Sequence, residues 1–257
     1  MERRKFVTTC ICCTCAFALS VPFAKNIVIN KKNTDSVQLK NDFLFEKIEI
    51  HLAENCNLGC KYCSHFSNIA DEEYYDIEKF EKDIKQLAFA TNKSVARLKL
   101  LGGEPLLHPK INDCLDIARK YFPDSNIELT TNGILLNSKD KSFWKTMNKN
   151  DITLILSVYP VKVDWKKVLN NAKKYNIETV ISGTNGNEYK DIRLGTINSF
   201  FKLNLDLSGN QDINRECEYK SYCANYIQGK LYPCFVVSNI RHFNKKCQIA
   251  ERANQSA

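Results

Sequence analysis

The chain has 257 residues, of which 44% are hydrophobic, so it can form one sizeable domain with a buried core and a small appendage. Its net charge is +8, but the lysines fall at helix-like spacings without a basic stripe of interleaved aromatic residues, which argues against a nucleic-acid-binding protein. Its 12 cysteines occur in clusters, and tight clusters of thiols favour metal ligation over a framework of disulfides.

Residues 1–44 are predicted to form an N-terminal extension. A charged start precedes a mostly apolar run at 6–24, an order that resembles an export signal, and Arg3-Arg4 is similar to a twin-arginine signal. The run also contains threonine, serine and proline and has marginal length for a membrane span, so a buried or irregular extension is the alternative. Membrane contact or export through residues 6–24 therefore stays open. The rest of the extension is expected to be a linker or an edge hairpin.

From residue 45 onward, strand-like and helix-like stretches alternate. The predicted strands are 46–53, 95–101, 126–131, 152–158, 177–182 and 201–207. The predicted helices are 76–91, 110–121, 138–148, 164–175 and 188–199. Such alternation predicts an α/β fold whose parallel strands are joined by right-handed crossovers, as an open or partial barrel. In folds of this kind chemistry collects at the C-terminal ends of the strands.

Three cysteines follow the first predicted strand: Cys56, Cys60 and Cys63, spaced as C-x3-C-x2-C. Iron–sulfur clusters normally have four cysteine ligands, so three would leave one iron with the open position that a catalytic metal site needs. The alternative is a zinc knuckle with His65 as a fourth ligand. Zinc ligands usually come as two pairs, however, and the loop after a buried strand favours the cluster.

Polar and glycine-rich segments follow the next three strands. Gly102-Gly103-Glu104-Pro105 follows the second strand, Thr130-Thr131-Asn132-Gly133 follows the third, and Ser157-Val158-Tyr159-Pro160 closes the fourth. The two glycines allow close backbone approach, and the proline holds the residue before it extended, so that backbone carbonyls can accept from an ammonium group. We expect these segments and the cysteine loop to face one mouth of the barrel.

With these motifs, residues 45–208 resemble the radical S-adenosylmethionine (radical SAM) enzymes. The resemblance implies a partial (β/α)6 barrel, a four-iron four-sulfur (4Fe–4S) cluster on the three cysteines, and SAM bound to the open iron. It also implies reductive cleavage of SAM to a 5′-deoxyadenosyl radical, which abstracts hydrogen from a peptide, a protein or a small organic substrate. The implied SAM contacts are Tyr62 near adenine, Gly102, Gly103 and Glu104 at the methionine amino group, and Thr131, Asn132 and Ser157 at the ribose or carboxylate.

Such an enzyme needs a low-potential electron donor such as flavodoxin or ferredoxin, and a reducing compartment, so the expected location is the cytoplasm. Three histidines, His51, His65 and His108, are candidate catalytic residues, although nothing in the sequence singles one out. A non-catalytic iron–sulfur or zinc protein on the same fold is the alternative to the enzyme.

The alternation of strand-like and helix-like stretches does not continue in residues 209–257, which are predicted to be a small cysteine-rich auxiliary segment. Its spacing Cys223-x5-Gly229-x4-Cys234 resembles the start of the SPASM or twitch extensions, which implies a second iron–sulfur cluster. The candidate ligands are Cys217, Cys223, Cys234 and Cys247. The later C-x2-C pairs of a full SPASM domain are absent, so the segment would hold at most one cluster. A zinc-stapled tail is the alternative, and a truncated chain is consistent with the short end after the last cysteine.

Overall fold

The structure is a computed structural model that describes residues 44–61, 63–182 and 224–247. The apolar run at 6–24, the predicted helix 188–199 and the predicted strand 201–207 lie outside these ranges. Tyr62, Cys217 and Cys223 lie outside them too. In the described ranges, no helix combines the length and the apolar character needed to cross a membrane.

In the described part of the chain, seven strands form one sheet in the order β5-β4-β3-β2-β1-β6-β7. They are β1 (Phe45–Ala53), β2 (Val95–Gly102), β3 (Asn126–Thr131), β4 (Ile152–Ser157), β5 (Thr179–Ser182), β6 (Asn225–Ile227) and β7 (Lys230–Tyr232). Neighbours from β1 to β5 are parallel, β6 is parallel to β1, and β7 is antiparallel to β6. The first five predicted strands and their parallel pairing are confirmed.

The described helices are α1 (Ile77–Ala90), α2 (Ile111–Tyr121), α3 (Lys141–Lys149), α4 (Trp165–Lys174) and α6 (Phe235–Cys247), with 3-10 turns η1 (Pro105–Leu107) and η2 (Ile134–Ser138). Four of them, α1 to α4, follow the predicted ranges closely, whereas α6 was not predicted. Helix α3 begins slightly later than predicted, because the Asp140 carboxylate accepts a hydrogen bond from Phe143 N at 3.0 Å and caps the first turn. The residues before it include the 3-10 turn η2, whose sequence pattern is similar to that of an α-helix.

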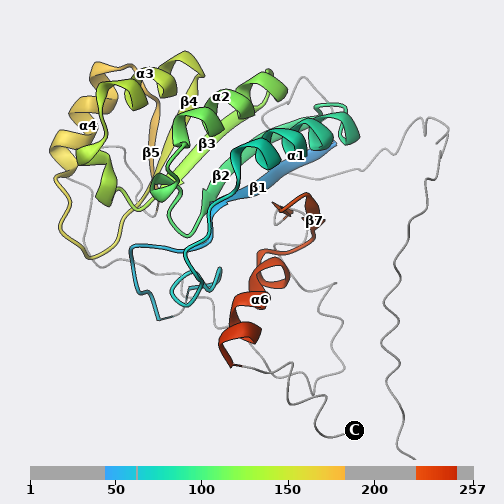
Figure 1. Cartoon of the computed structure of the whole chain (residues 1–257). Coiled ribbons are helices and arrows are strands. Elements are labelled where there is room, and N and C mark those ends of the chain that lie inside the picture. Colours follow the sequence, from blue (N-terminus) through green and yellow to red (C-terminus); the bar gives the residue numbers. More distant parts are fainter. Residues whose placement is uncertain (1–43, 62, 183–223, 248–257) are drawn as a thin grey trace, which may run out of the picture. The chain divides into compact units, whose positions relative to one another are not determined.

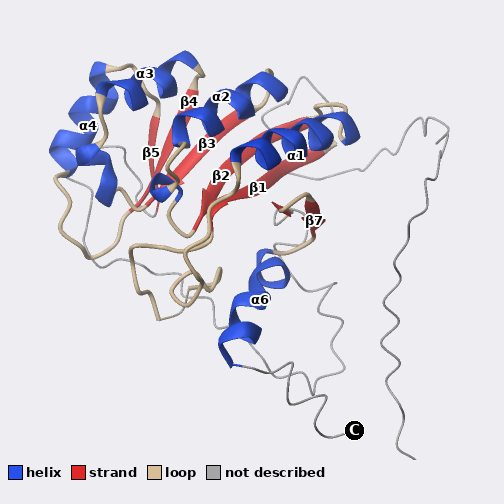
Figure 2. Cartoon of the chain, in the orientation of Figure 1, coloured by secondary structure: helices blue, strands red, loops and turns tan. Residues whose placement is uncertain are grey.

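Helices α1 to α4 cover one face of the strands, as Figures 1 and 2 show. Strands β1 to β5 follow one another across the sheet in chain order, always in the same direction. Right-handed crossovers between them therefore place every connecting helix on the same face of the sheet. The direction never reverses between β1 and β5, as it would in a doubly wound sheet, and the result is the wall of a partial barrel.

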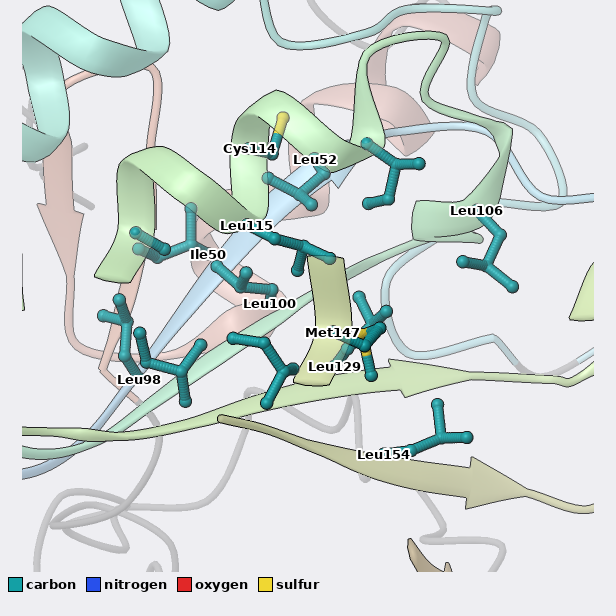
Figure 3. Packing of buried hydrophobic residues seen from close by; sticks show 14 of the residues in the cluster. Ile50, Leu52, Leu98, Leu100, Leu106, Cys114, Leu115, Leu129, Met147 and Leu154 are labelled. Carbon is teal, nitrogen blue, oxygen red and sulfur yellow. The ribbon is translucent and has the colours of Figure 1, made fainter. Parts of the chain in front are cut away.

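The core lies between this layer of helices and the sheet. Ile50 and Leu52 of β1, Leu98 and Leu100 of β2, and Leu129 of β3 are fully buried. Figure 3 shows them packed with Leu115 of α2 and Met147 of α3, among others. Cys114 belongs to this core, as its place on a helical pattern predicts. Because side chains alternate along a strand, the residues between these positions face the other side of the sheet, away from the helices.

The described part of the C-terminal segment joins the main sheet. Strand β6 pairs with β1, and Tyr226 of β6 donates a hydrogen bond from its hydroxyl to Asp83 O in α1 at 2.8 Å. The hydroxyl of Tyr75 donates to Asp83 Oδ2 at 2.6 Å and accepts from Gly229 N at 3.1 Å. The hairpin β6–β7 is thus attached to β1 and α1. The domain boundary at 208/209 stays a prediction, because it lies outside the described residues.

Candidate active site

A cavity of about 620 Å³ opens where the parallel strands end. Among the residues lining it are Cys56, Cys60, Cys63, Gly102, Gly103, Thr131, Asn132 and Ser157. These residues come from the loop after β1 and from the ends of β2, β3 and β4. The structure therefore brings to one cavity the described cluster ligands and SAM contacts predicted for the barrel, except Glu104, and of the three candidate catalytic histidines it brings only His65 there.

The three thiols lie in one irregular loop on the cavity wall. Cys56 Sγ accepts a hydrogen bond from Leu58 N at 3.4 Å, and Asn132 Nδ2 lies 3.8 Å from the same sulfur. Burial, together with the charges of Glu104 and the other two thiols, raises the pKa of Cys56 to about 11. A thiolate there needs a positive partner, which the irons of a cluster would provide.

The number and place of the thiols are those that a cluster needs. All three cysteines line the same cavity, as the thiolate ligands of one cluster must. His65, the candidate fourth zinc ligand, is partly buried and lines the same cavity.

Backbone hydrogen bonds fasten the glycine motif to the start of the cysteine loop. Gly103 N donates to Ala53 O at 2.8 Å, and Glu104 N donates to Asn55 O at 3.0 Å. A Cβ atom at Gly102 would lie 2.1 Å from Ala53 O, and one at Gly103 would lie 2.0 Å from Asn55 O. Gly102 also has a φ of +143°, which side-chain-bearing residues rarely adopt. Glycine is therefore required at both positions for this close approach.

The Glu104 side chain is turned into the protein and does not line the cavity. Its Oε1 accepts hydrogen bonds from Leu106 N at 3.0 Å and from Thr131 Oγ1 at 2.7 Å, while Oε2 accepts from Asn132 N at 2.9 Å. Burial raises the pKa of this carboxyl, although the three hydrogen bonds oppose the change. The carboxylate thus ties the end of β2 to the end of β3. Any contact of Glu104 with a ligand's amino group would have to come from its backbone.

The ends of β3 and β4 complete the rim. Asn132 Nδ2 donates to Asn57 Oδ1 at 2.7 Å, which connects the third strand end directly to the cysteine loop. Gly133 follows with a φ of +80° and packs so closely on Trp165 of α4 that a Cβ would lie 2.6 Å from the indole ring. Ser157 ends β4, and Tyr159 of the same segment also lines the cavity, as expected for the residues that follow this strand. Burial first, and then the nearby thiols, raises the pKa of Tyr159 to about 12.

A buried charged group that the sequence did not indicate lies directly before the cysteine loop. Glu54 Oε2 lies 2.8 Å from His242 Nε2, Glu54 Oε1 lies 2.9 Å from an Arg241 nitrogen, and His51 Nδ1 is 3.7 Å away. Burial by itself would raise the pKa of Glu54, but the hydrogen bond from His242, the nearby His51 ring and the charge of Arg241 lower it. His242 and Arg241 are remote in sequence, so no local pattern could reveal this contact.

The tail cysteines are only partly described. Cys234 follows β7, is partly buried and precedes helix α6, whose first turn includes a hydrogen bond from Ser238 N to Cys234 O at 3.1 Å. Cys247 ends α6, while Cys217 and Cys223 lie outside the described residues. The auxiliary cluster and the contact of Tyr62 with adenine therefore stay predictions.

The family model for the Radical SAM superfamily matches residues 50–158, from within β1 to just past the end of β4. This segment contains the cysteine loop, the glycine motif and the strand ends that line the cavity. Residues 50–158, less than half of the chain, are therefore similar to the radical SAM superfamily, a class of proteins that use a 4Fe–4S cluster and SAM.

Curated relatives include the GTP 3′,8-cyclase of Clostridium perfringens, which is 30% identical over 177 residues, or 62% of this chain and 53% of the relative. The GTP 3′,8-cyclase of Nautilia profundicola is 28% identical over 139 residues, or 53% of this chain and 42% of the relative. The chain spans about half the length of these curated relatives. A solved structure of BtrN in complex with AdoMet and 2-DOIA is 22% identical, with a TM-score of 0.49 over 78% of this chain and 77% of that chain.

Proposed function

We propose that this protein is a radical SAM enzyme that acts on a peptide, a protein or a small organic substrate. A single observation carries the proposal: Cys56, Cys60, Cys63 and the ends of three further strands line one cavity. The cluster, when bound, supplies reductive cleavage of SAM to a 5′-deoxyadenosyl radical, which abstracts hydrogen from the substrate.

The chain's own residues would bind and orient the cofactors. The three thiolates hold the cluster on the loop after β1, and Asn132 keeps that loop against the end of β3 through Asn57. Gly102 and Gly103 line the cavity beside the cysteine loop, and backbone carbonyls of this segment are the proposed acceptors for the amino group of SAM. Thr131, Asn132 and Ser157 are the proposed ribose or carboxylate contacts, because they lie at the adjoining strand ends. Tyr62, before the third cysteine, is the proposed neighbour of adenine.

The test is anaerobic reconstitution with iron and sulfide, followed by dithionite and SAM, with chromatographic measurement of 5′-deoxyadenosine. The wild-type protein should be brown and should form the product. Cys60→Ala should abolish product formation while the far-ultraviolet circular dichroism stays that of a folded protein. Cys114→Ala, which removes a thiol buried in the core, should keep the activity. If the fully reconstituted wild-type protein forms no 5′-deoxyadenosine, the proposal is wrong.

A non-catalytic iron–sulfur or zinc protein on the same fold is the competing function. It predicts bound metal without SAM binding, and calorimetric titration of SAM into the reconstituted protein distinguishes the two. The electron donor that we propose is flavodoxin or ferredoxin, and the proposed location is the cytoplasm, because a low-potential cluster needs a reducing compartment. Contact of residues 6–24 with a membrane stays an alternative, and finding this segment cleaved in the purified protein would favour export.

We also propose a second metal site in the segment 209–257, with Cys217, Cys223, Cys234 and Cys247 as its ligands. The SPASM-like or twitch-like spacing around Gly229 supports it, as does the position of Cys234 at the start of α6. Elemental analysis of the Cys60→Ala protein tests it. Retained iron indicates an auxiliary cluster, retained zinc indicates a zinc-stapled tail, and loss of all metal contradicts a second site.

A further inference from the structure

We propose that the inner part of the cavity binds an anionic oxygen group of the substrate, a carboxylate or a phosphate, through the Lys99 ammonium group and the Thr130 hydroxyl. This inference rests on the proposed function, because it assigns the deeper part of the same cavity to the substrate. It narrows the substrate class to molecules that carry such a group.

The alternation along β2 and β3 places both side chains on the cavity side of the sheet. Leu98, Leu100 and Leu129 are fully buried in the core beneath the helices, so Lys99 and Thr130, which lie between or beside them, face the opposite way. Both residues line the cavity. Lys99 precedes Gly102 by three positions, so it lies about 10 Å below the rim. A group bound there would lie deeper than the proposed SAM contacts at the strand ends.

The Lys99 ammonium group has acidic neighbours that are already paired with other cations. In the sheet register, Lys99 lies opposite Glu49 on β1 and Glu128 on β3. The Glu49 carboxylate is 2.9 Å from Lys47 Nζ, and the Glu128 carboxylate is 3.9 Å from an Arg97 nitrogen. Within the residues that the structure describes, Lys99 itself has no hydrogen bond or ion pair. Burial lowers the pKa of Lys99, although the charges of Glu49, which also lines the cavity, and of Glu128 oppose the change.

Further polar groups on the cavity wall also lack partners. Thr130 Oγ1, His65 Nε2 and Ser67 Oγ are buried without a hydrogen-bond partner in the described part of the protein, and all three side chains line the cavity. Buried polar groups are almost always hydrogen-bonded, so three of them on one wall indicate a ligand or ordered water. Hydroxyl groups and a neutral imidazole can each donate to an oxygen. Beside an ammonium group, which repels cations, such donors suit an anion.

The experiment measures thermal stabilisation of the reconstituted, SAM-loaded protein by sodium phosphate and by sodium succinate, against sodium chloride at equal ionic strength. We expect at least one of the two anions to raise the Tm of the wild-type protein by about 3 °C. Lys99→Met should lose this increase. Lys145→Met is the matched control, because it removes an exposed lysine of α3 and should keep the increase. Stabilisation by phosphate alone assigns a phosphate, and stabilisation by succinate alone assigns a carboxylate.

Two results would overturn the inference: no stabilisation of the wild-type protein by either anion, or equal stabilisation of Lys99→Met. The variant also separates binding from folding, because methionine keeps most of the length of a partly buried side chain and should leave the Tm without anions close to the wild-type value. SAM cleavage by the wild-type protein is measured separately. Cleavage without anion stabilisation contradicts only this inference, whereas stabilisation without cleavage contradicts only the proposed function.

Discussion

Replacing Gly103 by alanine tests whether the close approach of two loops holds the site together. The new Cβ would lie 2.0 Å from Asn55 O and 2.8 Å from Glu54 O, so the backbones would have to separate by about 1 Å to reach a tolerable contact. The hydrogen bonds from Gly103 N to Ala53 O and from Glu104 N to Asn55 O, now 2.8 and 3.0 Å long, would then be lost. Two such bonds contribute about 1 kcal/mol each, and overpacking adds about 1–3 kcal/mol. We expect the free energy of unfolding to fall by about 3–5 kcal/mol.

The assay for this variant is urea unfolding followed by circular dichroism, with a matched control in the cysteine loop. An ideal Cβ at Gly59 meets no heavy atom within 4 Å, so Gly59→Ala should change the free energy of unfolding by less than about 0.5 kcal/mol. Because Asn55 immediately precedes Cys56, Gly103→Ala should also weaken SAM binding to the reconstituted protein. If both alanine variants unfold at the same urea concentration, the close approach is not what makes glycine necessary at position 103.

Two further predictions concern buried charges. The pKa of Glu54 is lowered in the folded protein, so the stability that its ionised form contributes is present above about pH 4.5 and is lost as the pH falls below that value. Thermal melts should therefore show that wild type is more stable than Glu54→Gln above pH 5, with a difference that shrinks below pH 4.5; a constant difference would contradict this. Arg119 donates hydrogen bonds to the carbonyls of Phe122, Pro123, Ser125, Asn150 and Asp151. Arg119→Met should reduce the free energy of unfolding by about 2–4 kcal/mol in urea titrations, and an unchanged midpoint would contradict this.

The parallel sheet and the location of the site were predictable because both depend on local patterns. Alternation of strands and helices determines the parallel pairing, and the motif residues follow directly after strands. Residues such as Cys56, Gly103 and Asn132 therefore had to meet at the C-terminal edge of the sheet, as they do around the cavity. The sequence also indicated that a glycine was needed in the motif, although only the structure shows which backbone oxygen each glycine approaches.

The polar residues on β1 and β2 that line the inner part of the cavity were not predicted, although the sequence contains a pattern that indicates them. The run from Ile48 to Ala53 includes Glu49 and His51 at alternate positions, and Lys99 alternates in the same way with Leu98 and Leu100. A strand buried on both faces would be apolar throughout, so this period of two indicates one apolar and one polar face. Strand β6 could not be predicted in this way, because three residues carry no period and its partner β1 is far away in the sequence.

Helix α6 contacts residues before and after the cysteine loop, so it connects the C-terminal segment to the loop that carries the proposed cluster ligands. Before the loop, Arg241 and His242 bind the Glu54 carboxylate, two residues from Cys56. After the loop, the His65 and Phe235 rings lie with centroids 5.3 Å apart, and Phe66 packs on Phe243 at 5.8 Å.

The Glu54 contact is the strongest of these, because removing one partner would leave a buried charge without compensation. The loop that carries the three thiols is therefore held between two sets of contacts with one helix. Since Cys234, a proposed ligand of the second metal site, lies directly before that helix, α6 connects this residue to both sides of the loop that carries Cys56 and Cys63.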